Sequence, residues 1–224
     1  MAQIGSASAD VLLGGDLEFS YQQSLAGDDR LLGTEGNDTI EGGEGRDTLN
    51  GDAGDDLLTA GPETGDLADT IYGGSGNDTI SGGDGNDLVN GGIGNDVIDG
   101  GFGTDTLAGQ DGADSLTGGA WSDMIFGGVD DDFINGGFGY DRLNGGTGAD
   151  RFLHLGVADH GSDWIQDYDA AEGDLLVFAT LAPSENFHLS FAQTEGAGDG
   201  DVAEAFITYR PTGQILWALV DGAA

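Results

Sequence analysis

Apolar residues recur at every ninth position between residues 33 and 153, apart from one insertion, and a glycine-rich hexapeptide separates each short apolar triplet from the next. Residues 82–90 read GGDGNDLVN, and residues 91–99 read GGIGNDVID. With the unit numbered from 1 to 9, the template is G-G-x-G-x-D-x-U-x, where U is a large apolar residue. Position 8 is apolar in all thirteen units: Ile40, Leu49, Leu58, Ile71, Ile80, Val89, Ile98, Leu107, Leu116, Ile125, Ile134, Leu143 and Phe152. Such a fixed period predicts a solenoid.

The composition of the unit predicts a turn followed by a short strand. Positions 1 to 6 cannot form a helix, because each glycine there would cost about 1 kcal/mol relative to alanine. They suit a tight turn with positive φ and exposed carbonyl groups. Positions 7 to 9 are rich in Thr, Ile, Leu and Val, which favours a strand with position 8 on one face and positions 7 and 9 on the other. We therefore expect two units to form one coil.

Position 6 is aspartate in every unit, and this column carries the candidate chemistry. Its members are Asp38, Asp47, Asp56, Asp69, Asp78, Asp87, Asp96, Asp105, Asp114, Asp123, Asp132, Asp141 and Asp150. Coiling brings the aspartate of unit i near that of unit i+2, about 4.8 Å along the axis, with turn carbonyls directed at the same place. Carboxylate and carbonyl oxygens select hard cations, and a flexible shell of oxygen ligands suits Ca²⁺ better than Mg²⁺.

The charge of the chain strengthens the case for a cation. The sequence holds 42 acidic residues against 5 basic ones, for a net charge of −37. A thin aliphatic core with that charge should stay disordered unless something neutralises it. The chain has no Cys, and its three His residues lie outside the repeats, so zinc and copper are not expected. The acidity also argues against nucleic acid and anionic membranes as partners.

These repeats resemble those of the RTX (repeats-in-toxin) family of secreted, haemolysin-type calcium-binding proteins. The resemblance implies an all-β fold: a right-handed parallel β-roll, or β-solenoid, with a β-rich C-terminal cap. It also implies one Ca²⁺ between units i and i+2, on the order of ten ions in total. Positions 2, 4 and 6 of the first unit and positions 1, 3 and 6 of the second would be the ligands. One ion would then contact Gly74, Gly76, Asp78, Gly91, Ile93 and Asp96.

Carried along the chain, the resemblance assigns ligands to many turn positions besides the aspartate column. They are Thr34, Gly36, Gly43, Gly45, Gly51, Asp52, Ala53, Gly54, Gly73, Gly74, Ser75, Gly76, Gly82, Gly83, Asp84, Gly85, Gly91, Gly92, Ile93, Gly94, Gly100, Gly101, Phe102, Gly103, Gly109, Gln110, Asp111, Gly112, Gly118, Gly119, Ala120, Trp121, Gly127, Gly128, Val129, Asp130, Gly136, Gly137, Phe138, Gly139, Gly145, Gly146, Thr147 and Gly148. Five of these depart from the glycine template, at position 2 (Thr34, Asp52, Gln110) and position 4 (Trp121, Asp130). Four extra residues, 62–65, interrupt one turn, so we discount the two sites that use it.

Two regions follow from this organisation. Residues 1–153 form the roll, with degenerate units to residue 32, regular units over 33–153, and insertions at 16–25 and 62–65. Residues 154–224 form a capping and secretion-signal region that covers the end of the solenoid. Residues 161–178 resemble the cap of serralysin-type proteins through their D-x-I-x-D-[FY] and G-D-x-[IL] elements; Asp163, Asp167 and Asp174 match them. These three carboxylates either finish the last calcium sites or are solvated. A strand at 187–193 and a hairpin around RPTG should follow.

Alternate units share an edge of the roll, and the two edges differ. Units that start at 14, 42, 60, 82, 100, 118 and 136 share one edge, which should carry both insertions. The same edge carries Phe102, Trp121, Phe138 and Tyr140, whereas the other carries Ile93 and Val129. Three interpretations stay open: position 3 is simply permissive, the edge binds an extracellular glycan or protein, or the cap packs over it. Threonine at position 7 raises a weaker idea, an ice- or sugar-binding face (Thr39, Thr48, Thr70, Thr79, Thr106).

Motifs for catalysis do not occur in the sequence. The chain has no HExxH, no G-x-S-x-G, and no P-loop or Rossmann fingerprint, so we do not expect an enzyme. One function class is a stand-alone secreted calcium-binding module that acts as a folding switch and serves as an adhesive or matrix component. The alternative is the C-terminal part of a secreted enzyme, such as a serralysin-type metalloprotease, lipase or alginate epimerase. A degenerate unit directly after Met1 favours the first class.

The expected location follows from calcium and from the resemblance. The N-terminus has neither a basic start nor an apolar stretch, unlike a Sec signal, and no transmembrane run occurs. Modest-affinity calcium sites work at extracellular concentrations, about 10⁻⁴–10⁻³ M. The resemblance implies export from Gram-negative bacteria by the type I secretion machinery.

Overall fold

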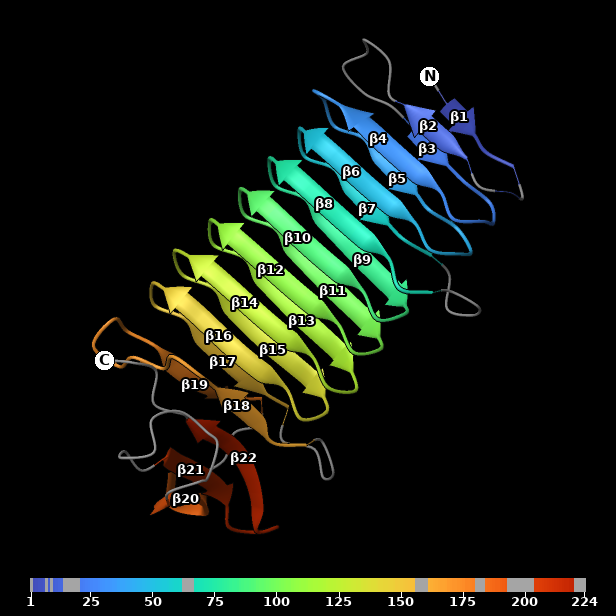
Figure 1. Cartoon of the computed structure of the whole chain (residues 1–224). Helices are drawn as coiled ribbons and strands as arrows, with labels where there is room; N and C mark the ends of the chain where they lie inside the picture. Colours follow the sequence, from blue (N-terminus) through green and yellow to red (C-terminus); the bar gives the residue numbers. More distant parts are fainter. Residues whose placement is uncertain are drawn as a thin grey trace.

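The chain folds into two parallel β-sheets that face each other along a solenoid (Figure 1). The computed structural model describes residues 2–6, 8, 10–13, 21–61, 67–155, 161–179, 184–192 and 204–219. Strands alternate between the sheets in chain order, so each coil gives one strand to each sheet. This arrangement confirms the all-β parallel β-roll. The described residues contain no helix of the length and hydrophobicity needed to cross a bilayer.

The two sheets divide the strands by odd and even number until the cap. The 10-stranded sheet contains β1 (Ala2–Ile4), β3 (Tyr21–Gln23), β5 (Thr39–Glu41), β7 (Leu57–Thr59), β9 (Thr79–Asp84), β11 (Val97–Phe102), β13 (Ser115–Ala120), β15 (Phe133–Phe138), β17 (Arg151–His154) and β19 (Leu175–Phe178). The 12-stranded sheet contains β2 (Val11–Leu13), β4 (Arg30–Thr34), β6 (Thr48–Ala53), β8 (Thr70–Ser75), β10 (Leu88–Ile93), β12 (Thr106–Asp111), β14 (Met124–Val129), β16 (Arg142–Thr147), β18 (Asp163–Ile165), β22 (Gln214–Leu219), β21 (Glu204–Tyr209) and β20 (Phe187–Ala192). A short 3-10 helix, η1 (Ser184–Asn186), precedes β20.

The regular strands are longer than the sequence indicates. Each continues from positions 7–9 of one unit through positions 1–3 of the next, and the turn shrinks to positions 4–6. Parallel pairing drives this extension: Leu88 lies opposite Thr106, and Gly92 lies opposite Gln110 in the same ladder. Coil-to-coil hydrogen bonds therefore override the turn preference of glycine.

The core is one column of position-8 side chains between the two sheets. All thirteen of these residues are buried, with Ile80 the most exposed at 2%. Leu31 continues the column on the N-terminal side and Ile165 on the C-terminal side. The predicted inward direction of position 8 is confirmed.

The segment before residue 33 differs from the expectation. Strand β3 pairs in parallel with β1 and β5, so an additional unit occupies part of what looked like an insertion at 16–25. Its position-8 residue is Gln22, which is 0% exposed and donates a hydrogen bond from Nε2 to the carbonyl of Leu32. Because a polar residue occupies this apolar position, the sequence pattern did not reveal the unit. Residues 14–20 connect β2 to β3 and lie outside the described residues. Residues 62–65 lie outside them as well, so the expectation that both insertions share one edge falls on residues that the structure does not describe.

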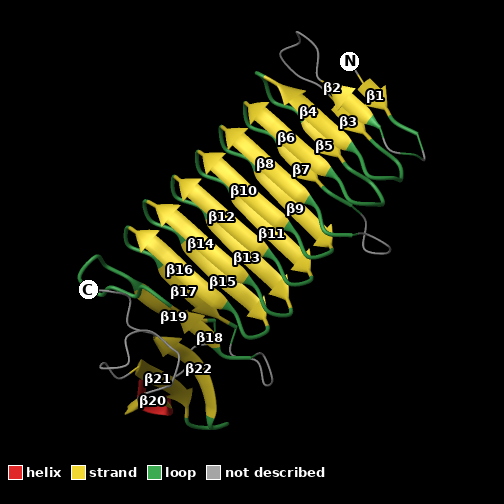
Figure 2. Cartoon of the chain, viewed as in Figure 1, coloured by secondary structure: helices red, strands yellow, loops and turns green. Residues whose placement is uncertain are grey.

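The parallel ladders of the roll continue past residue 153 into the expected capping region. Strand β18 pairs in parallel with β16, and β19 pairs in parallel with β17. Beyond them, β22 joins β18 in parallel and forms an antiparallel sheet with β21 and β20 (Figure 2). The predicted hairpin around RPTG is therefore present, and its strands cover the C-terminal end of the 12-stranded sheet. The residues 62–65 and the C-terminal residues 220–224 lie outside the described residues.

Candidate metal centres

The position-6 aspartates form two buried files, one on each edge of the roll. Edge 1, where the chain passes from the 10-stranded to the 12-stranded sheet, carries Asp29, Asp47, Asp69, Asp87, Asp105, Asp123 and Asp141; edge 2 carries Asp38, Asp56, Asp78, Asp96, Asp114, Asp132 and Asp150. Every one of these residues is at most 3% exposed. The backbone N–H of Asp78 donates to Oδ1 of Asp96 at 2.8 Å, and that of Asp96 donates to Oδ1 of Asp114 at 2.7 Å. The predicted stacking of units i and i+2 is thus present in the structure.

One oxygen of most of these carboxylates has no hydrogen-bond donor. Within the described residues, Oδ2 is buried and accepts no hydrogen bond in Asp56, Asp78, Asp96, Asp105, Asp114, Asp123 and Asp132. A buried carboxylate oxygen without a partner is unfavourable by several kcal/mol unless a proton or a cation neutralises it. The row of such oxygens defines where positive charge is required.

Burial raises the pKa of these carboxyl groups. For Asp96 burial is the main cause, the carboxylates of Asp114 and Asp78 add to it, and the pKa is about 7. The pKa of Asp123 and that of Asp132 rise to about 8 for the same reasons. At neutral pH the roll without cations therefore holds carboxyl groups that resist ionisation.

Backbone carbonyls meet the same carboxylates. Gly91 has no side chain, and a Cβ built on it would meet Oδ2 of Asp96 and lie 3.0 Å from the carbonyl oxygen of Gly109. The equivalent trio of Gly82, Asp87 and Gly100 recurs on edge 1. The position-6 carboxylate of one unit thus lies close to the position-1 carbonyl of the unit one coil later, and both belong to the ligand set that the resemblance implies.

The donor set fits Ca²⁺. It consists of carboxylate and carbonyl oxygens, which hard divalent cations prefer. The described residues contain no cluster of three or more His, Cys, Asp or Glu side chains that could hold a metal by themselves. Any ion between two coils would therefore combine two aspartates with backbone oxygens.

Four of the five template departures keep the turn geometry of glycine. Asp52, Gln110, Trp121 and Asp130 have φ between 78° and 87°, which is the left-handed region that glycine favours. Their carbonyl groups therefore belong to turns of the regular kind. Thr34 differs, because it is buried and its hydroxyl donates to the carboxylate of Asp38 at 3.0 Å.

The aspartate file on edge 1 continues through the interrupted unit. The backbone N–H of Asp47 donates to Oδ1 of Asp69 at 2.6 Å, and that of Asp69 donates to Oδ1 of Asp87 at 2.8 Å. The carboxylates of both discounted sites are therefore in register, and only the turn that should complete them falls outside the described residues.

The cap extends both files. Asp163 is 0% exposed, and burial together with the neighbouring carboxyl group of Asp141 raises its pKa well above the ordinary value. Asp174 accepts a hydrogen bond at Oδ1 from the backbone N–H of Asp150 at 3.0 Å. Asp167 accepts from the N–H groups of Gly145 and Gly146 at 2.9 and 2.6 Å. The interpretation of these carboxylates as simply solvated is wrong.

A second ladder at position 5 was not expected. Oδ1 of Asn77 accepts from the N–H of Asn95, and Oδ1 of Asn95 accepts from the N–H of Ala113, both at 2.8 Å. On edge 1, Oδ1 of Asn86 accepts from the N–H of Thr104 at 2.8 Å. The signal in the sequence was the frequent Asn or Asp at position 5, and its role is to join neighbouring turns.

Fold and site together define a calcium-binding parallel β-roll with acidic turns stacked on both edges. The family comparison names the family: four copies of the RTX calcium-binding nonapeptide repeat match residues 24–58, 63–98, 99–134 and 122–152. The chain belongs to this family and is a Ca²⁺-binding repeat module. Among curated proteins, none matches it.

Proposed function

We propose that this chain is a secreted, non-catalytic module that folds when it binds Ca²⁺ outside the cell. The buried carboxylate oxygens without donors carry the proposal, because folding creates them and the unfolded chain solvates them. A cation between two coils would neutralise two carboxylates at once, so the free energy of binding becomes free energy of folding.

The number of ions follows from the two aspartate files. Each ion would use the carboxylates of units i and i+2 with the turn carbonyls between them, as in the set Gly74, Gly76, Asp78, Gly91, Ile93 and Asp96. Both files together give on the order of ten Ca²⁺ ions. Asp163 and Asp174 would complete the last sites of edge 1 and edge 2.

Two points support a location outside the cell: the Ca²⁺ concentration that such sites need, and the usual location of proteins in this family. Extracellular modules bind Ca²⁺ at about 10⁻⁴–10⁻³ M, whereas sites of that affinity stay empty in the cytosol. Proteins with RTX repeats are typically secreted. The type I secretion machinery would export the chain unfolded, and external Ca²⁺ would then fold it.

The non-catalytic role is adhesive or structural. The position-6 carboxylates of the regular coils lie in the two buried files, and the aromatic side of edge 1 offers an exposed surface for a partner. An extracellular glycan or protein would bind there.

The direct test is circular dichroism of the whole chain during a Ca²⁺ titration. We expect a largely disordered far-UV spectrum in EDTA and β-structure in millimolar Ca²⁺, with millimolar Mg²⁺ as the matched control that leaves the chain disordered. A chain that is already folded in EDTA at neutral pH and does not respond to Ca²⁺ would refute the proposal.

A further inference from the structure

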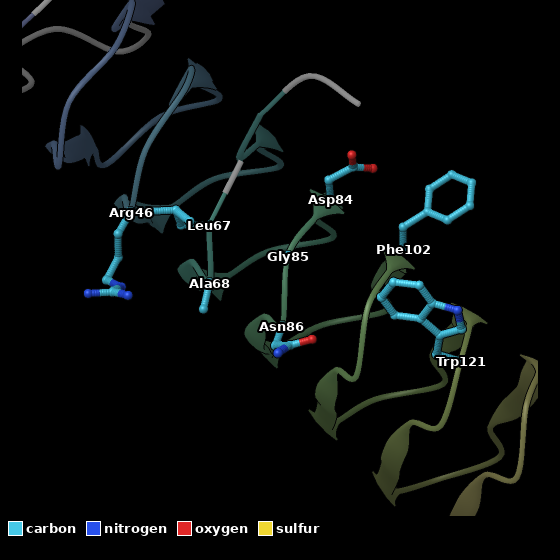
Figure 3. Close-up of a pocket in the computed structure, with 8 residues that line it drawn as sticks. All are labelled: Arg46, Leu67, Ala68, Asp84, Gly85, Asn86, Phe102 and Trp121. Carbon is cyan, nitrogen blue, oxygen red and sulfur yellow. The ribbon is translucent and has the colours of Figure 1, made fainter. Parts of the chain in front are cut away.

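Edge 1 carries a groove that the calcium sites do not explain. One cavity of about 710 Å³ is lined by Arg46, Leu67, Asp84, Asn86, Phe102 and Trp121 (Figure 3). A second cavity of about 430 Å³ is lined by Trp121, Ser122, Phe138 and Tyr140. Trp121 borders both cavities, which therefore lie next to each other along successive coils of the edge, and together we call them the groove of edge 1.

The aromatic rings of this groove are open to solvent. Phe102 is 56% exposed, Trp121 66%, Phe138 50% and Tyr140 69%. Figure 3 shows Phe102 and Trp121 on neighbouring coils, with both rings projecting from the ribbon. The interpretation that the cap packs over these rings is therefore wrong.

Trp121 is costly for the fold. It takes φ = 87° at position 4, where Gly94, Gly103 and Gly112 have φ between 124° and 139°. A residue with a Cβ in this region costs about 1–2 kcal/mol relative to the right-handed backbone. The exposed indole offsets little of that through packing, so the fold alone favours glycine here. A strained and exposed tryptophan indicates a binding role.

We propose that the groove of edge 1 binds a neutral, linear glycan in an extended conformation, with one sugar ring stacked on Trp121. This inference rests on the proposed function, because only the folded, Ca²⁺-loaded roll presents the groove. Successive coils lie about 4.8 Å apart, a spacing close to the length of one pyranose unit in an extended chain. Rings on successive coils can therefore meet successive sugars of one glycan.

The polar residues and the charge of the chain fix the class of glycan. Asp84, Asn86 and Ser122 line the same cavities as the rings, which suits sugars because they combine flat apolar faces with hydroxyl edges. Aromatic faces also bury large area with little loss of side-chain entropy. The chain carries a net charge of −37, and about ten bound Ca²⁺ ions would still leave a net charge of about −17, which repels uronic or sulfated glycans and a second copy of this chain. Among the described residues that line the groove, only Arg46 is basic.

The test is isothermal titration calorimetry of the full chain in millimolar Ca²⁺. The probes are hexamers of β-1,4-linked glucose and of β-1,4-linked mannose, with oligogalacturonate of the same length as the anionic probe. We expect at least one neutral hexamer to bind and the anionic probe not to bind. Trp121→Gly restores the template residue and keeps the backbone carbonyl. It should weaken binding about tenfold, equivalent to one stacked ring, without lowering the melting temperature.

Tyr72→Ala is the matched control, since Tyr72 is an exposed aromatic residue of β8, 42% exposed and outside the groove. The Tyr72→Ala variant should bind the neutral hexamer with the affinity of the unchanged chain. Failure of every neutral hexamer to bind a chain that circular dichroism shows to be folded would overturn the glycan proposal and leave the calcium proposal standing. Equal affinity for Trp121→Gly and the unchanged chain would also overturn it, as would self-association that Trp121→Gly abolishes.

Discussion

The regular roll and the cap bury their interiors with different chemistry. Between β8 and β16 each coil buries two aliphatic side chains and two carboxylates. In the cap, Phe178, Phe187 and Tyr209 pack with ring centroids 5.2–5.7 Å apart, and His154 packs edge-on against Trp217 at 5.5 Å. The roll therefore depends on positive charge from outside, whereas the cap depends on apolar contact within the chain.

Protonation is the strongest way to test this difference, because it removes the charge without any metal. The folded-state pKa values lie above the ordinary value of 3.8, at about 6 for Asp105 and Asp114 and about 8 for Asp123 and Asp132. A raised folded pKa contributes stability that is full below pH ~4 and is lost as the pH rises through about 6 to 8. We therefore expect acidification from pH 8 to pH 5 in EDTA to restore much of the β-structure.

Far-UV circular dichroism during a pH titration in EDTA measures this effect, with light scattering to confirm that the chain stays monomeric. In Ca²⁺ the direction is opposite, because protons compete with the ion for the same oxygens, and the Ca²⁺ midpoint should rise as the pH falls. A chain in EDTA that loses structure on acidification from pH 8 to pH 5 would contradict the role of the buried carboxylates.

The cap should respond to loss of apolar contact. Trp217 is 2% exposed and touches His154, so Trp217→Ala should cost about 3–5 kcal/mol of local stability. We expect faster amide hydrogen exchange in β20–β22 and unchanged protection in β9–β14, measured in saturating Ca²⁺. Ile215→Ala, at a half-exposed site in the same strand, is the control. Equal loss of protection in the middle of the roll would mean that the cap and the roll unfold as one unit.

Within the roll, position along the file should decide the effect of losing one carboxylate. Asp96 accepts a hydrogen bond from Asp78 and donates one to Asp114, so it belongs to two stacked pairs in the regular region. Asp38 lies near the degenerate start. Because coils stabilise their neighbours, Asp96→Ala should raise the Ca²⁺ midpoint for folding several-fold more than Asp38→Ala. Equal midpoints in the two variants, measured by circular dichroism, would argue against the stacked-pair arrangement.

The sequence predicts the regular coils well because each unit repeats the same two constraints, an apolar residue at position 8 and an aspartate at position 6. It fails where one constraint is replaced. Gln22 fills an apolar position, so its unit looked like inserted residues. In the cap, Asp163 with Ile165 and Asp174 with Leu176 keep both constraints, but the connections between them no longer follow the nine-residue period. The exposure of the aromatic rings on edge 1 depends on where the cap lies, which no local pattern encodes.

The smallest expected effect concerns single non-glycine residues in left-handed turns of the roll. Gln110 has φ = 87° at position 2 and an exposed side chain. Gln110→Gly relieves about 1–2 kcal/mol of backbone strain. The greater conformational freedom of glycine in the unfolded chain lowers this stabilisation by about 0.5–1 kcal/mol. A net gain of up to about 1 kcal/mol should remain, visible as a small rise in melting temperature at saturating Ca²⁺.

Val129→Gly is the matched control, because Val129 ends β14 without a positive φ and glycine there brings the entropic penalty without relief of strain. If Gln110→Gly and Val129→Gly lowered the melting temperature equally, the left-handed backbone at position 2 would not be a source of strain, and the argument that Trp121 is costly for the fold would lose its support.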